Sequence, residues 1–199
     1  MKKLDLLVTG VGGQGNILAS DIICEVAIDA GFDVKKTDTL GMAQRGGSVL
    51  SNVRIAQQVY SPLIKEGEVD ILLAFEKLEA ARWAHYLRKG GIAIINNQAL
   101  PSLSIILGNE QYPDDEKIFE LLKQKTDSIY FIEGTQKARE LGNVRTLNIF
   151  MLGCISPFTP FKVSSWKARL SEHLPANLRP INLTAFDLGR KEIKNARVR

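Results

Sequence analysis

Short, uninterrupted apolar runs alternate along the chain with segments whose apolar residues recur at helical spacing. The runs at 4–8, 69–75 and 92–95 contain almost no polar residue, which predicts strands buried on both faces of a parallel sheet. The segments at 16–30 and 76–87 instead place their apolar residues along one helical face. This alternation predicts an α/β fold with a doubly wound, mostly parallel sheet.

Further segments extend the same alternation toward the C-terminus. Strands are predicted at 32–38, 49–55 and 129–132, with a short edge strand at 103–107. Helices are predicted at 115–125, 135–141, 144–155, 163–174 and 181–195, and the helix at 76–87 is expected to close at Gly90 and Gly91. Asn148 interrupts an otherwise apolar helix, and a half-buried amide usually needs a hydrogen-bond partner.

The length of 199 residues favours a single domain spanning 1–199. Its start is Rossmann-like, because the strand at 4–8, a glycine turn, a helix and the strand at 32–38 form a βαβ unit with a right-handed crossover. Residues 156–199 are expected to form a helical C-terminal extension. That extension either packs as an appended element or makes a contact with another subunit.

The net charge of +4 belongs to the C-terminal tail, since residues 189–199 hold five basic residues and one acid and the rest of the chain is neutral. We interpret the tail as a solvated end; docking to an acidic partner or to nucleic acid is the alternative. No aromatic residue interleaves the tail for base stacking, so nucleic-acid binding is not expected.

Cys24 and Cys154 lie far apart in apolar helical patterns, which predicts buried free thiols in a reduced, cytoplasmic protein. No apolar run approaches the roughly 20 residues of a membrane span, and the first residues do not resemble a signal peptide. His85 and His173 are the only histidines. Neither has ligands or partners at a spacing that predicts a metal site or a general base.

Gly10, Gly12 and Gly15 satisfy the G-x-G-x-x-G pattern between a predicted strand and a predicted helix. The first glycine permits a tight turn, the second lets backbone approach a ligand or another chain, and the third lets the helix sit close to the sheet. Free N–H groups at a helix start also favour an anion. A phosphate ligand and a purely structural turn both remain open.

A dinucleotide site also needs an acid about 20 residues beyond the glycines, at the end of the second strand. Lys35 and Lys36 stand at about that distance, and Asp38 follows at or past the strand end. An independent NAD(P)- or FAD-binding oxidoreductase is therefore the alternative rather than the leading function.

A second glycine motif, Gln44-Arg45-Gly46-Gly47-Ser48-Val49, precedes the strand at 49–55. The paired glycines bring backbone close to a neighbour, and Arg45 can grip a carboxylate or phosphate through two parallel hydrogen bonds. The alternative is a turn that carries a solvated arginine.

Together the two glycine motifs resemble those of the gamma-type domain of 2-oxoacid:ferredoxin oxidoreductases. These enzymes form the pyruvate/2-ketoisovalerate:ferredoxin oxidoreductase family. Within that family, the chain resembles the beta subunits of indolepyruvate:ferredoxin oxidoreductases. The shared residues are Ser61-Pro62, Ala74-Phe75-Glu76, Glu79-Ala80 and Tyr112-Pro113. The resemblance extends through about Gly153 and is weaker over the closing helices.

The resemblance implies a subunit of a complex that converts an aryl pyruvate and coenzyme A to acyl-CoA and carbon dioxide, passing electrons to ferredoxin. It further implies that a large alpha subunit carries thiamine diphosphate, magnesium and iron–sulfur clusters, and that this chain alone binds no cofactor. The sequence agrees, because it lacks a Gly-Asp-Gly segment and its two isolated cysteines cannot supply a cluster's four thiolates.

We therefore expect a subunit that completes an active site built mainly by its partner. Arg45 is the candidate catalytic residue, stabilising an anionic group. Loops expected to contact ligand or partner, at the carboxyl end of the sheet, hold Gly10, Gly12, Gly13, Gln14, Gly15, Gln44, Gly46 and Gly47. The alternative is that both loops only pack against the partner.

Overall fold

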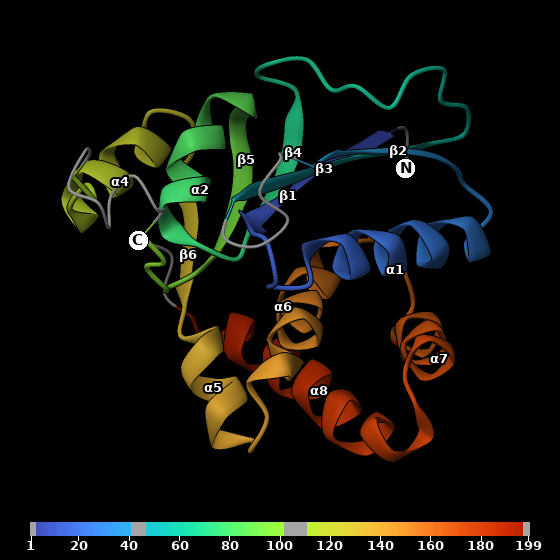
Figure 1. The fold of residues 1–199 in the computed structure, drawn as a ribbon. Coiled ribbons are helices and arrows are strands. Elements are labelled where there is room, and N and C mark those ends of the chain that lie inside the picture. Colours follow the sequence, from blue (N-terminus) through green and yellow to red (C-terminus); the bar gives the residue numbers. More distant parts are fainter. Residues whose placement is uncertain (1–2, 41–46, 102–110, 197–199) are drawn as a thin grey trace.

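A computed structural model describes residues 3–40, 47–101 and 111–196 of the chain. Its six-stranded sheet has the order β2-β3-β1-β4-β5-β6 (Figure 1). The strands are β1 (Lys3–Val11), β2 (Asp33–Leu40), β3 (Ser48–Ala56), β4 (Val69–Ala74), β5 (Leu87–Asn96) and β6 (Ser128–Ile132). The pairs β1–β4, β4–β5 and β5–β6 are parallel, and β3 runs antiparallel to both of its neighbours.

Seven α-helices are described, some extended by short 3₁₀ turns. They are α1 (Asn16–Asp29), α2 (Lys77–Trp83), α4 (Asp115–Lys123), α5 (Gly134–Glu140), α6 (Leu147–Ile155), α7 (Val163–His173) and α8 (Arg179–Asn195). The 3₁₀ turns are η1 (Ala84–Tyr86), η2 (Val144–Thr146), η3 (Ser156–Phe158) and η4 (Ala176–Leu178). The predicted α/β class with a mostly parallel sheet is confirmed.

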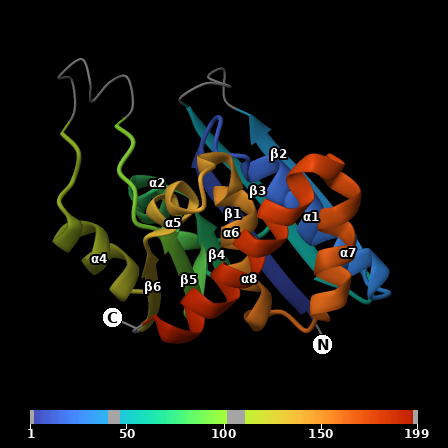
Figure 2. The same ribbon diagram turned by 90° about the horizontal axis from the view of Figure 1, so that it is seen from below.

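Helices cover both faces of the sheet and create two cores. On one face α1, α6, α7 and α8 pack over Leu6 and Val8 of β1, and on the other α2 and α4 pack over Leu7 (Figure 2). Successive side chains of β1 therefore enter opposite cores, as the unbroken apolar run at 4–8 predicted. No described helix combines the length and apolar content needed to cross a membrane.

The start of the chain differs in pairing from the expected βαβ unit. β1 and β2 are parallel and joined through α1, but β3 lies between them as an antiparallel strand. The alternating pattern at 49–55 predicts a strand, but it does not predict where that strand lies in the sheet. The predicted edge strand at 103–107 lies outside the described residues.

The helix predicted at 76–87 is shorter than expected. α2 ends at Trp83, and β5 begins at Leu87, so Gly90 and Gly91 lie inside a strand rather than behind a helix. A Cβ atom on Gly91 would stand 3.1 Å from the carbonyl oxygen of Asp70. Gly91 therefore lets the backbones of β4 and β5 lie close together beside the register shift between these strands.

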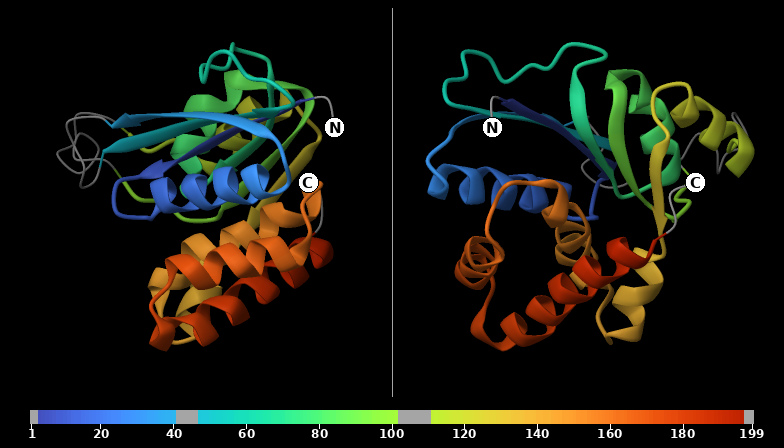
Figure 3. Two further views of the ribbon diagram at one scale, coloured as in Figure 1. Left: turned by 90° about the vertical axis from the view of Figure 1, so that its right-hand side faces the viewer. Right: turned by 180° about the vertical axis from the view of Figure 1, so that it is seen from behind.

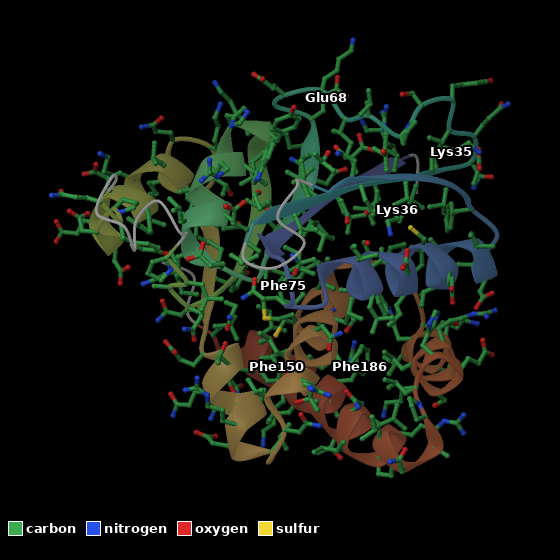
Figure 4. All side chains as sticks on the ribbon, in the orientation of Figure 1. Lys35, Lys36, Glu68, Phe75, Phe150 and Phe186 are labelled. Atoms are coloured by element: carbon green, nitrogen blue, oxygen red, sulfur yellow. The ribbon has the colours of Figure 1, made fainter. Side chains whose placement is uncertain are left out.

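The closing helices are continuous with the main core. Phe186 of α8 and Phe150 of α6 are fully buried in the same apolar cluster as the first strand, below the sheet in Figure 4. α6 and α8 cross at Gly153 and Gly189, where an added Cβ would stand about 2 Å from the opposing backbone (Figure 3). Backbone-to-backbone contact therefore joins the two helices.

Cys24 and Cys154 are both buried free thiols, as predicted. Burial raises the pKa of the Cys24 thiol from 9.0 to about 12, because the thiolate would lose its hydration. Burial raises the pKa of Cys154 as well. Both thiols are therefore protonated and unreactive in the folded chain.

We expect the free energy of unfolding to fall as the pH rises above 9, because the unfolded Cys24 thiol then ionises while the folded one keeps its proton until about 12. The loss is up to about 1.4 kcal/mol per pH unit for each such thiol. Urea unfolding at pH 8 and pH 10 measures it, and a Cys24→Ala variant should lose less stability over that interval. Equal losses in the two proteins would contradict the assignment to Cys24.

Candidate functional site

The glycine turn after β1 is held by the side chain of Gln14. Its Oε1 accepts a hydrogen bond from the N–H of Val11 at 2.7 Å, and its Nε2 donates to the carbonyl of Phe75 at 3.0 Å, so the turn is tied to the end of β4. A Cβ on Gly10 would stand 2.7 Å from that Oε1 and 2.8 Å from Phe75 Cβ. Because Gly10 has no side chain, it leaves room for the side chain of Gln14.

The second glycine motif lies beside the first. The N–H of Gly12 donates to the carbonyl oxygen of Gly47 at 2.8 Å, next to the final β1–β3 pair, Val11 with Ser48. Gln44, Arg45 and Gly46 lie outside the described residues. The part of the second motif that is described thus reaches the same edge of the sheet as the glycine turn.

Helix α1 begins directly after the turn, with Gly15 as its N-cap residue at a φ of 81° and no side-chain cap. The φ of Gly13 is 103°, and both conformations are ones that L side chains rarely adopt. Asn16, in the first turn of the helix, is 3% exposed, and neither polar atom of its side chain has a hydrogen-bond partner among the described residues. The helix start therefore retains unsatisfied donors.

A cavity of about 510 Å³ opens at this helix start. We call it the α1–α5–α6 cavity, because its wall comes mainly from the glycine turn with α1, from α5, and from η2 with α6. Its lining residues are Gly13, Gln14, Gly15, Leu18, Gln98, Leu100, Thr135, Arg139, Val144, Arg145, Leu147 and Asn148. Among the residues that the structure describes, the lining holds two arginines and no acidic residue.

Arg139 and Arg145 were not expected from the sequence to belong to a site. They lie on α5 and η2, more than 120 residues beyond the glycine turn, and no motif marks them. Asn148 did carry a signal, as the one amide within an apolar helix. It packs against the turn, since a Cβ on Gly15 would stand 2.7 Å from Asn148 Nδ2.

Two buried carboxylates lie at the same edge of the sheet: Glu76, the N-cap residue of α2, and Glu79 within that helix. Glu76 is 1% exposed and accepts hydrogen bonds from the Tyr112 hydroxyl at 2.5 Å, the Glu79 N–H and the Leu100 N–H. Burial, followed by the neighbouring Glu76 carboxylate, raises the pKa of Tyr112 well above its usual range. Tyr112 therefore stays a hydrogen-bond donor. Glu79 accepts from Ser48 Oγ at 2.5 Å, which ties the second motif to α2.

The acid that a dinucleotide site would need is already engaged. Asp38 accepts a hydrogen bond from Ser51 Oγ at 2.6 Å and pairs with Lys36 at 3.1 Å. The strand that bears it is separated from β1 by β3. This arrangement does not present a ribose-binding carboxylate beside the glycine turn, and the dinucleotide function is not favoured.

The two histidines lie away from the cavity. His85 is 3.7 Å from Glu66, and His173 Nε2 is 2.7 Å from Glu25 of α1. Within the described ranges, no three His, Cys, Asp or Glu residues gather in a way that could hold a metal ion. The edge of the sheet therefore offers backbone donors, amides and guanidinium groups, which suit the binding of an anion.

Comparison with known proteins identifies a family and relatives of this chain. Residues 5–192 match the family model for pyruvate ferredoxin/flavodoxin oxidoreductase. The chain is 34% identical over 197 residues to the indolepyruvate oxidoreductase subunit IorB of Pyrococcus horikoshii, covering 98% of each protein.

Two solved structures share the fold. The gamma subunit of a keto/oxoacid ferredoxin oxidoreductase from Geobacter sulfurreducens has a TM-score of 0.71 at 22% identity, over 97% of this chain and 99% of that one. The 2-oxoglutarate:ferredoxin oxidoreductase of Magnetococcus marinus, solved with 2-oxoglutarate, coenzyme A and succinyl-CoA, has a TM-score of 0.77 at 23% identity. The match covers all of this chain but 32% of that one, so the chain corresponds to about a third of its length.

Proposed function

Because the chain belongs to the pyruvate ferredoxin/flavodoxin oxidoreductase family, we propose that it is the small subunit of an indolepyruvate-type 2-oxoacid:ferredoxin oxidoreductase. The observation that carries this proposal is 34% identity to an indolepyruvate oxidoreductase subunit along 98% of both chains. The complex would oxidatively decarboxylate an aryl pyruvate with coenzyme A to an acyl-CoA and pass the electrons to ferredoxin. We place it in the cytoplasm, and we treat residues 1–199 as a single gamma-type domain with 156–199 as its helical C-terminal extension.

The redox cofactors belong, in this proposal, to a large alpha subunit. An iron–sulfur cluster normally requires four thiolates, and the sequence has two cysteines, which are buried on α1 and α6. Thiamine diphosphate with magnesium needs carboxylate and amide ligands on a dedicated loop, and the sequence has no Gly-Asp-Gly segment. The residues of this chain do not fit either group, so the chemistry that these cofactors supply is the partner's.

This chain contributes a prepared face at the carboxyl edge of its sheet. Gln14 braces the glycine turn, the Gly12–Gly47 hydrogen bond holds the second motif beside it, and Glu79 fixes Ser48. On this face we propose that Arg45 stabilises an anionic group of substrate or cofactor. The backbone of Gly10, Gly12, Gly13, Gly15, Gly46 and Gly47, with the side chains of Gln14 and Gln44, would contact the ligand or the partner.

An affinity capture from the native cell tests the proposal. The tagged chain is purified and the eluate is assayed with indolepyruvate, coenzyme A and a viologen dye as electron acceptor. We expect a large, brown, thiamine-containing subunit to co-purify and the dye to be reduced when coenzyme A is present. The control omits coenzyme A.

Two other outcomes of this capture would change the proposal. A folded chain that elutes alone and binds NAD or FAD would make the glycine turn a true dinucleotide site. Dye reduction with pyruvate or 2-oxoglutarate but not with indolepyruvate would keep the family role and reject the aryl substrate.

A further inference from the structure

We propose that the connection between β3 and β4, residues 57–68, is a docking surface for a second copy of this chain. Tyr60 of each copy would enter a hollow beside Arg54 of the other copy. The inference does not rest on the proposed oxidoreductase function, because the residues that it uses lie in this chain and its test needs no other subunit.

Two large apolar side chains of this connection face solvent. Tyr60 is 86% exposed and Leu63 is 65% exposed, more than any other large apolar side chain among the described residues. The connection forms the upper border of the molecule in Figure 1, next to the N-terminal end of β1. Isolated exposed apolar residues are ordinary, but two of them three positions apart, one of which is a tyrosine, are typical of an interface.

Hydrogen bonds and buried side chains hold the connection in place. The Val59 N–H donates to Asp33 Oδ2 at 2.8 Å, and Arg54 Nη1 donates to the Leu63 carbonyl oxygen at 2.9 Å. Val59 and Ile64, on either side of the exposed pair, are both buried. The exposed side chains are therefore presented by an anchored segment, and such preorganisation lowers the entropy cost of binding.

A hollow of about 340 Å³ lies directly beside Tyr60. Its lining includes Lys3, Arg54 and Gln58, and Tyr60 itself forms part of its wall. Since a cavity of about 150 Å³ is enough to hold benzene, this hollow has room for the phenol ring of a tyrosine. A projecting ring and a recess of suitable size thus occupy the same surface.

Charge complementarity favours an aromatic ring in this hollow. The edge of the Arg54 guanidinium group is engaged, because Nε donates to Asp5 Oδ1 at 3.1 Å and Nη1 donates to Leu63. A guanidinium group bonded at its edge can still stack face-on with a ring. Lys3, whose ammonium group is 2.7 Å from Asp5, adds a second cation. Such cations attract the electron-rich face of an aromatic side chain, and Tyr60 supplies one.

A second copy of the chain is the occupant that matches both features. Two-fold pairing brings the same surface of each copy together, so a ring that projects next to a recess meets the recess of the other copy. Each dimer would contain two contacts between Tyr60 and Arg54, with the two Leu63 side chains beside them. The surface is complementary to itself and needs no feature from another protein.

Sedimentation equilibrium of the purified full chain over a concentration series tests the inference. We expect a reversible dimer whose dissociation constant rises about 30-fold or more in Tyr60→Ala, the effect of removing a central anchor from an interface. Tyr60→Phe should keep most of the affinity, because it keeps the ring. The Tyr60 side chain is exposed, so both variants are expected to fold.

Gln58→Trp tests the recess separately, since a bulky side chain on this exposed lining residue would fill the hollow of its own chain. The dimer should weaken although Tyr60 is unchanged. Ile28→Ala is the matched control. It removes a side chain that is 56% exposed on α1, which covers the face of the sheet opposite to the core that Ile64 enters. Its dissociation constant should equal that of the unchanged chain.

Three outcomes would overturn the inference. The first is a chain that sediments as a monomer up to the highest concentration at which it stays in solution. The second is a dimer whose dissociation constant is the same in the unchanged chain, Tyr60→Ala and Gln58→Trp. The third is a Tyr60→Ala variant whose sole defect is the loss of a different co-purifying protein, which would assign the surface to a contact with that protein.

Discussion

Replacing Gly189 by alanine is expected to destabilise the folded chain strongly. The added Cβ would stand 2.0 Å from the carbonyl oxygen of Phe150 and 3.1 Å from the backbone nitrogen of Cys154. Overpacking a core usually costs about 1–3 kcal/mol when side chains can shift, but here the obstacle is the backbone of a buried helix. A loss of at least about 3 kcal/mol follows, a large share of the roughly 5–15 kcal/mol that stabilises a typical domain.

Thermal unfolding followed by circular dichroism measures this loss. At about 2–4 °C per kcal/mol for a chain of this length, the midpoint should fall by roughly 10 °C, or the chain should be recovered unfolded. Lys191→Ala, an exposed change in the same helix, should leave the midpoint within a degree or two. A Gly189→Ala midpoint equal to that of the control would show that α6 and α8 can separate freely.

Gly153 meets the reciprocal obstacle, since its Cβ would stand 2.1 Å from the carbonyl oxygen of Phe186. Once one alanine has forced α6 and α8 apart, the second alanine meets a contact that is already weakened. The double variant should therefore lose less stability than the two single losses added together.

This helix crossing shows where sequence patterns stop being informative. The buried strands were predictable because an apolar run indicates burial on both faces. β1 and β5 contain the runs that were expected, and β4 contains its run except for Phe75. A glycine within a helix reports nothing about the helix it will meet. The contact between Gly153 and Gly189 joins positions distant in sequence, so the closing helices looked like an extension.

The candidate site divides in the same way. The glycine turn was predictable from its spacing, but two of its glycines are needed for other reasons than those predicted. Gly10 lies in β1 and leaves room for the Gln14 side chain, and Gly15 has a φ of 81° and lies against Asn148 of α6. Arg139 and Arg145 are exposed arginines with no sequence motif around them, and they line one cavity with the glycine turn only because the fold brings α5 and η2 beside it. Asn148 is intermediate, since its polarity within an apolar helix predicted a need for a partner without indicating which one.

The second large effect is expected at Arg45, in the assembled complex rather than in the isolated chain. If Arg45 stabilises an anion that forms or tightens during the reaction, Arg45→Ala should lower kcat about 100-fold, the usual loss for one preorganised charged donor. The kcat of Arg45→Lys should lie between those of the unchanged enzyme and Arg45→Ala, because a lysine keeps the charge and loses the two parallel hydrogen bonds. Steady-state dye reduction with indolepyruvate and coenzyme A gives kcat, and size-exclusion chromatography shows whether the complex is intact.

The same measurement separates catalysis from packing. A packing role predicts that Arg45→Ala weakens assembly, so that activity recovers when the variant subunit is added in excess over the large subunit. A catalytic role predicts a low kcat that excess subunit cannot restore, with the complex eluting at its normal position. Lys89→Ala, with its charge removed at the far edge of the sheet, should match the unchanged enzyme in both assays. Full activity in an intact Arg45→Ala complex would exclude both roles for Arg45.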